Sequence, residues 1–175
     1  MSDWIDRLDA VQARLHALAE RDLNGLTGPD AKTGEQWEAA QVWAHLAEFG
    51  DYWLDELDKV LAGATTFGRI KTDPARIAAI ARDRSVPLPE LVCRIDASLA
   101  RLAAQLRNMT DDDWARTATH QTLGEMTIDD QLQHFHVGHY EEHADQLESL
   151  TVSERSERTK ETAPPRHEEP PEAAP

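Results

Sequence analysis

The segment TIDDQLQHFHVGHYEEHADQLESL, residues 127–150, decides the fold, because it combines a helix start, a long amphipathic pattern and four of the chain's eight histidines. Thr127 and Asp130 have the spacing of a capping box at a helix N-terminus. At about 100° per residue, the apolar side chains form one stripe, and His139 and His143 lie within it. The pattern predicts one continuous helix over the whole segment.

Three more segments space their apolar residues three and four positions apart, as amphipathic helices do. They run from about Asp3 to Asp22, from about Glu38 to Ala62, and from near Pro89 to near Met109. The connection over residues 63–88 is too long for a bundle made only of tight hairpins. Together the four helices predict an all-α fold, a four-helix bundle over residues 1–150.

Two shorter helical pieces are expected between the long helices. Asp73 can cap a helix that begins at Pro74, and Thr110 can cap a single turn that ends near Trp114. No run of five or more residues alternates with a period of two. Residues 115–126 are therefore predicted to form a loop, and no β-strand is expected.

The last 25 residues, 151–175, differ in composition from the rest of the chain. They hold five of the nine prolines and no Leu, Ile, Phe, Trp or Tyr. Such a segment buries too little apolar surface to offset the entropy lost on ordering. Residues 151–175 are predicted to be a disordered C-terminal tail, separate from the helical domain.

Composition also restricts the partners. Lys and Arg number 18 against 33 Asp and Glu, a net charge of −15, which argues against nucleic acid and anionic membrane surfaces as partners. No apolar run is long enough to span a bilayer, and the N-terminus lacks a signal-peptide pattern. The single cysteine, Cys93, excludes an internal disulfide framework and favours a cytoplasmic location. Its helical position predicts a small buried side chain.

The histidines are the candidate functional residues, as ligands of a metal ion. His139 and His143 lie one helical turn apart, so both can direct a ring nitrogen at one metal ion. His45, in the middle of the second helix, offers a third imidazole on a face that leans apolar. The plainer interpretation of each is a packed histidine bonded to a carboxylate or carbonyl group. His136 falls at the edge of the apolar stripe, whereas His134 faces away and is predicted to be solvated.

Two rival metal motifs can be weighed on the same residues. The string from His139 to His143 also fits the H-x-x-E-H pattern of inverted zinc peptidases, with Glu142 as general base. An ordinary exposed carboxylate is the favoured interpretation of Glu142. A di-iron carboxylate bundle needs glutamate three residues before histidine on two helices, a spacing that no histidine here has.

Three segments resemble the DinB/YfiT-like superfamily, over roughly residues 1–150. WEAAQVWAHL, residues 37–46, is similar to that family's second-helix motif, in which a tryptophan precedes a histidine by eight positions. HYEEHADQL, residues 139–147, resembles its closing helix, in which HxxxH is followed by glutamine and an aliphatic residue. The acidic turn that ends at Trp114 resembles the turn that often precedes that helix.

The resemblance implies a four-helix bundle with a non-sequential helix order. It also implies a divalent metal ion held by His45, His139 and His143, with open positions for water or substrate, which is the catalytic pattern. The metal is Zn, Ni, Fe or Cu, since neutral imidazoles suit all four. Members of this family include thiol transferases that use low-molecular-weight bacterial thiols, a thiol-dependent isomerase and many proteins without an assigned reaction.

Three functions follow as hypotheses. The first is a metal-dependent enzyme that activates a thiol or water, of the thiol S-transferase or hydrolase type, with a small-molecule substrate such as a low-molecular-weight thiol. The second is a non-catalytic module, stress-related or a carrier, that binds a metal or small ligand. The third is a metal-free bundle with packed histidines. The five tryptophans are compatible with a homodimer interface.

Overall fold

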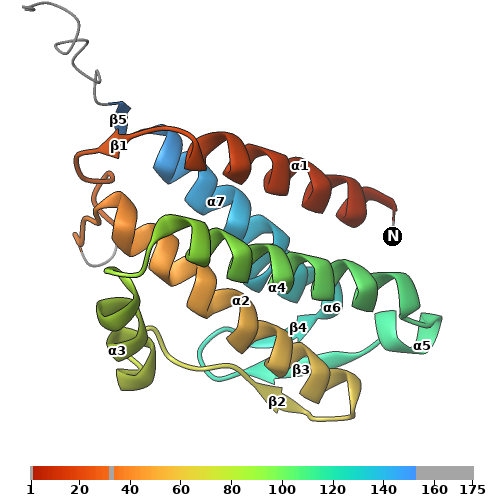
Figure 1. The fold of residues 1–175 in the computed structure, drawn as a ribbon. Helices are drawn as coiled ribbons and strands as arrows, with labels where there is room; N and C mark the ends of the chain where they lie inside the picture. The colour runs from red at the N-terminus through yellow and green to blue at the C-terminus, as the bar shows by residue number, and fades with distance from the viewer. Residues whose placement is uncertain (1, 32–33, 153–175) are drawn as a thin grey trace, which may run out of the picture.

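The computed structural model describes residues 2–31 and 34–152, and it is a mostly helical bundle (Figure 1). The helices are α1 (Ser2–Ala19), α2 (Ala39–Leu61), α3 (Pro74–Asp83), α4 (Leu88–Asn108), α5 (Asp111–Trp114), α6 (Ile128–Phe135) and α7 (Val137–Glu148). The strands are β1 (Leu23–Asn24), β2 (Thr66–Phe67), β3 (Thr117–His120), β4 (Gly124–Thr127) and β5 (Thr151–Val152). The predicted fold class is confirmed.

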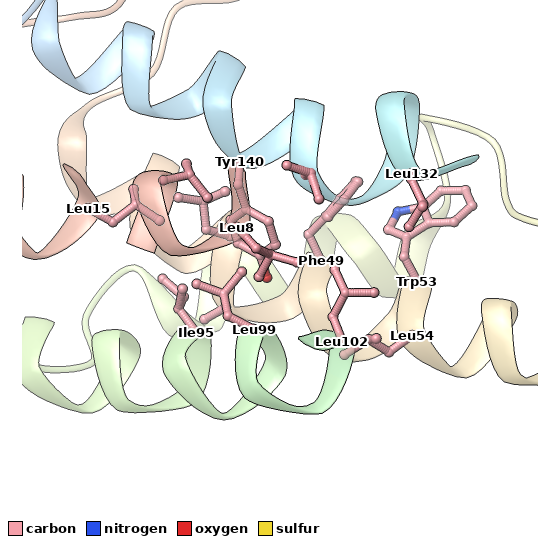
Figure 2. Packing of buried hydrophobic residues seen from close by; sticks show 14 of the residues in the cluster. Leu8, Leu15, Phe49, Trp53, Leu54, Ile95, Leu99, Leu102, Leu132 and Tyr140 are labelled. Carbon is pink, nitrogen blue, oxygen red and sulfur yellow. The ribbon is translucent and has the colours of Figure 1, made fainter. Parts of the chain in front are cut away.

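The helices do not pack in the order of the sequence. α1 packs against α7 and α4, whereas α2 packs mainly against α4 and also contacts α3 and α7 (Figure 1). Leucine and isoleucine side chains from α1, α2 and α4 fill the centre, with Leu8, Leu54 and Leu99 among those labelled in Figure 2. Each such side chain contributes about 1.5–3 kcal/mol on burial, so this apolar centre holds the bundle together.

The predicted helix starts are confirmed by their hydrogen bonds. The hydroxyl of Thr127 accepts from the backbone N–H of Asp130 at 3.1 Å, and the Asp130 carboxylate accepts from the backbone N–H of Thr127 at 3.0 Å. The Asp73 carboxylate accepts from the backbone N–H groups of Ala75 and Arg76 at the start of α3. These caps satisfy backbone donors that have no partner inside the helix.

The prediction of a loop over residues 115–126 is wrong. β3 pairs antiparallel with β4, and β2 joins β3 in parallel, so three short strands form a small sheet beside the lower end of α2 in Figure 1. In β3, Ala118 and His120 are buried while Thr117 and Thr119 are exposed. Alternation over only four residues is too short to stand out in the sequence, and contacts with α2 and its neighbours decide it.

The predicted closing helix is interrupted. α6 ends at Phe135 and α7 begins at Val137, with His136 in a non-helical conformation at φ −136° and ψ −106°. A Cβ atom at Gly138 would lie 2.1 Å from the carbonyl oxygen of Gln133, so only glycine allows the two helices to approach this closely. The interruption rotates α7 relative to α6, and His136 is buried, at 3% exposure, rather than at an edge.

Three further expectations can be compared with the structure. Cys93 is exposed, so its predicted burial is wrong, because the buried face of α4 passes through Leu91 and Ile95 on the other side of the helix. The predicted disordered tail begins two residues too early, because β5 pairs with β1. Residues 153–175 lie outside the described residues. Of the described helices, none combines the length and apolarity needed to cross a membrane.

Candidate metal centre

The three histidines that the sequence singled out lie together. His45 comes from α2, and His139 and His143 come from α7. The Nε2 atom of His139 lies 3.0 Å from Nε2 of His45 and 2.9 Å from Nε2 of His143. One ligand atom from each ring lies within 4.8 Å of the others, a spacing that could hold one metal ion. We call these three residues the histidine triad.

Aromatic side chains hold the triad in place. Phe49, one turn after His45 on α2, stacks on the ring of His139 with centroids 3.7 Å apart. The ring of Trp37 lies 5.2 Å from that of His45 and parallel to that of His143. His45 itself belongs to a buried run on α2 that begins at Val42. The three imidazoles are therefore fixed by packing rather than carried on flexible loops.

The hydrogen-bond partner of His143 identifies its tautomer. Its Nδ1 lies 2.8 Å from the Oε1 atom of Gln146, so the Nδ1–H group donates to this amide oxygen. The Nε2 atom of His143 is then unprotonated, and its lone pair faces His139. A histidine that ligates a metal through one ring nitrogen normally donates its other N–H group to such an acceptor.

Burial keeps the triad neutral. Desolvation is the largest cause of the lowered pKa in each ring, and it holds the pKa values of His45 and His139 well below the ordinary 6.5. It lowers the pKa of His143 to about 4, partly opposed by the hydrogen bond to Gln146. Neutral imidazoles are the form that binds a metal ion.

The three rings fit a bound cation better than they fit one another. Nε2 of His139 contacts two other nitrogens, and one proton makes a good hydrogen bond to only one of them. The remaining contact then either lacks a well-directed proton or brings two lone pairs together. Nδ1 of His45 is also buried and without a hydrogen-bond partner. A divalent cation shared by the three Nε2 atoms would remove the repulsion between the lone pairs, so the residues fit a metal ion.

The triad opens into a cavity of about 560 Å³. Its walls include four aromatic side chains, Trp37, Phe49, Trp53 and Phe135, together with polar and charged residues. Adjacent rings along this wall are in contact, since Phe49 lies 5.6 Å from Trp53, and Trp53 stacks on Phe135 at 3.9 Å. A cavity of this size and lining suits a small molecule beside the triad.

Three basic side chains line the same cavity, and two of them are neutralised. Arg69 pairs with Glu48 at 2.5 Å, and Lys71 pairs with Asp30 at 2.8 Å. Arg76 donates to the backbone carbonyl of Lys71 at 3.1 Å. No carboxylate among the residues that the structure describes pairs with Arg76, and desolvation lowers the pKa of its guanidinium.

His120 is a cavity residue that the search for metal ligands did not single out. Its Nδ1 atom accepts from the backbone N–H groups of Thr122 and Leu123 at 3.2 and 3.3 Å, so the proton lies on Nε2. A Cβ atom at Gly68, whose φ is +90°, would lie 2.3 Å from Cδ2 of His120. No sequence signal marks His120, because both its burial and its partners come from the unpredicted sheet.

The remaining sequence candidates lie around the triad rather than in it. Glu142 is exposed and lines the cavity. His134 is exposed, as predicted, while the buried His136 does not line the cavity. Burial lowers the pKa of His136 to about 3, so it is neutral as well.

Comparisons with known proteins agree with the fold. The family model described as the DinB superfamily matches residues 7–147. YfiT from Bacillus subtilis, described as a probable metal-dependent hydrolase with an unusual four-helix bundle topology, is structurally similar. Its TM-score is 0.68 and its sequence identity 22%, over 84% of this chain and 83% of YfiT.

A second similar structure is that of the mycothiol-dependent maleylpyruvate isomerase. The TM-score is 0.64 and the identity 14%, over 83% of this chain and 60% of the isomerase. A histidine-to-alanine mutant of the isomerase gives 0.65 and 13%, over 87% and 62%. This chain thus spans less than two thirds of the isomerase. A search of curated proteins finds no match.

Proposed function

The chain belongs to the DinB superfamily, and from this premise we propose that it is a metal-dependent enzyme whose divalent ion is held by His45, His139 and His143. One observation carries the proposal: three neutral imidazoles from two helices bring their Nε2 atoms together at the wall of an open cavity. Without an ion, the Nε2 atom of His139 would keep an unfavourable contact with one of its two neighbouring nitrogens, which would destabilise the fold.

The proposed reaction is the activation of a thiol or a water molecule for attack on a small electrophilic substrate. A divalent ion bound by neutral imidazoles lowers the pKa of a thiol or water toward neutrality and acts as a Lewis acid. Zn, Ni and Fe all suit this donor set. Thiol transfer and hydrolysis both use such a nucleophile, and the relatives are a probable hydrolase and a thiol-dependent isomerase.

The chain's own residues would orient and shield the reacting groups. Gln146 holds His143 with its Nε2 lone pair toward the centre of the triad. Phe49 restrains His139 by stacking. The aromatic wall from Trp37 to Phe135 excludes water from one side of the cavity, which strengthens electrostatic interactions there.

Glu142 is a candidate for a general base, since it lines the cavity and directly precedes His143 in the sequence. Its exposure favours a supporting role, because an exposed side chain is not held in one position. A non-catalytic carrier is the second candidate function. It would use the same triad but would present no exchangeable position to a substrate.

Cobalt substitution tests the enzyme against the carrier. The Co²⁺-loaded protein should show a visible absorption spectrum that changes on addition of azide or a small thiol, because these ligands enter an open coordination position. The His134→Ala variant is the matched control and should give the same spectrum. A spectrum that no added ligand alters would identify a closed site and would support the carrier instead.

A further inference from the structure

Arg76 is the basic cavity side chain that forms no direct ion pair with a carboxylate among the described residues. Arg69 and Lys71 are paired with carboxylates, whereas Arg76 donates to the Lys71 carbonyl oxygen and lies with its Cζ atom 5.6 Å from the ring centre of Trp37. Glu48, Glu35 and Asp73 attract its charge without pairing with it directly. Arg76 is half-buried, so its guanidinium is partly desolvated. A partly desolvated guanidinium without a direct carboxylate partner is suited to bind an anionic ligand.

Arg76 lies close to the triad. The ring of Trp37 lies near Arg76 as well as near the rings of His45 and His143. Arg76 and the three triad histidines also line the same cavity. A divalent ion on the triad would add further positive charge to the same region. The triad itself contributes no carboxylate to offset it.

The other end of the cavity is apolar. Its wall continues from Phe49 through Trp53 to Phe135. Two of the chain's exposed large apolar side chains, Ile70 at 45% and Leu123 at 52% exposure, also line this cavity. Apolar side chains left exposed around a cavity are typical of a ligand-binding surface. The cavity thus offers one cationic position and one extended apolar surface.

We propose that Arg76 binds a carboxylate of the substrate, and that the cavity selects amphiphilic carboxylic acids whose apolar body packs against the aromatic wall. The assignment rests on the proposed function, since it takes this cavity to be the substrate site. The planar guanidinium suits a carboxylate, with which it forms two parallel hydrogen bonds. A phosphate ester is the less favoured anion, because the other two basic side chains already have partners.

Fluorinated probes measured by ¹⁹F NMR test this assignment on the full-length protein. 4-Fluorobenzoate should bind about 10- to 100-fold more tightly than the neutral 4-fluorobenzamide, which has the same shape, because only the acid forms charge-assisted hydrogen bonds. Equal affinities would overturn the proposal without any variant. Tighter binding of 4-fluorophenyl phosphate than of 4-fluorobenzoate would overturn the choice of a carboxylate.

Substitutions of Arg76 and Lys71 test which side chain causes the preference for the acid over the amide. Arg76→Gln should reduce the preference for benzoate over benzamide to about twofold or less, while Arg76→Lys should keep part of it. Lys71→Gln removes one positive charge from the same cavity and should keep the parent's preference, since Lys71 is already paired. Equal losses in Arg76→Gln and Lys71→Gln would show only a general charge effect and would overturn the role of Arg76.

Titrations of the metal-free protein distinguish anion binding by Arg76 from anion binding by a metal ion on the triad. The titrations are repeated after treatment with a chelator, and metal binding by the triad is measured separately by calorimetry. A benzoate preference that survives chelation and disappears in Arg76→Gln supports Arg76, even if the triad binds no metal. A preference that disappears on chelation but survives in Arg76→Gln assigns the carboxylate to the metal and overturns the inference.

Discussion

Helix α2 contacts apolar side chains on one side, and histidines and a cavity on the other. Toward α4 it buries apolar side chains, among them Leu54, against Leu99 and Leu102 in the centre of the bundle (Figure 2). Toward α7 it places His45 against two further histidines and an open cavity. The first side stabilises the fold by removing apolar surface from water. The second side buries titratable groups and leaves space, which is what a binding site requires.

The two sides should respond differently to acid, and this is the largest expected effect. The histidines of the triad have folded-state pKa values below 6.5, so the unfolded chain takes up protons first as the pH falls. Their contribution to stability is complete above about pH 6.5 and is lost as the pH falls toward about 4. Between pH 6.5 and about 4, protonation linked to His143 alone should lower the free energy of unfolding by about 3 kcal/mol.

Urea unfolding of the metal-free protein between pH 7.5 and 4 measures this slope. His143→Ala should reduce the pH dependence by about one proton, and the exposed His134→Ala should leave it unchanged. Metal affinity of the folded protein should likewise fall near pH 4, rather than near the 6.5 of an exposed histidine. Loss of metal already at pH 6.5 would show that the triad is solvated.

A truncated side chain on the apolar side of α2 should lower the free energy of unfolding by a similar amount. This loss should not depend on metal. Leu102→Ala removes a fully buried side chain on α4 and should lower the free energy of unfolding by about 2–5 kcal/mol. The loss should be the same with and without a chelator, since Leu102 does not line the cavity. A loss that depends on the chelator would mean that the two sides of α2 are energetically coupled.

Metal should stabilise the protein only through the triad. At a hundredfold excess over Kd, a metal bound by the folded state alone adds about 2.7 kcal/mol to the free energy of unfolding. Replacing His45, His139 or His143 with Ala should remove this increment, measured as the shift in melting temperature on addition of metal. His134→Ala and His120→Ala should retain it. If His45→Ala still binds metal as tightly as the parent, the proposed triad is incorrect.

The smallest effect is expected from deletions at the C-terminus. Deleting residues 153–175 should leave the melting temperature within about a degree or two, because this segment has no apolar anchors. A deletion that starts at Thr151 also removes β5 and the hydrogen bond from the Thr151 hydroxyl to the Asn24 carbonyl at 3.0 Å. The longer deletion should therefore cost more than the shorter one.

Periodicity and capping alone predict the long helical segments and place His139 and His143 on one helix face. A helix with a wide apolar face repeats its signal over many turns, so its existence can be predicted locally. His139 and His143 lie on one face because the helical repeat places residues four apart together. The resemblance to the DinB/YfiT-like superfamily then supplied the third ligand, His45, and the family model bears out that resemblance.

Tertiary structure alone decides the features that make the triad a site. β2 joins β3 across about fifty residues, a pairing that no local pattern encodes. The β3–β4 hairpin is local, but its strands of four residues are too short to give a clear alternation. The interruption at His136 is accompanied by a close approach to Gln133 that Gly138 permits. The fold pairs Arg69 and Lys71 with carboxylates and leaves Arg76 without a direct carboxylate partner among the described residues. The physical reason is the same each time: burial and charge pairing depend on what the rest of the chain brings to that point.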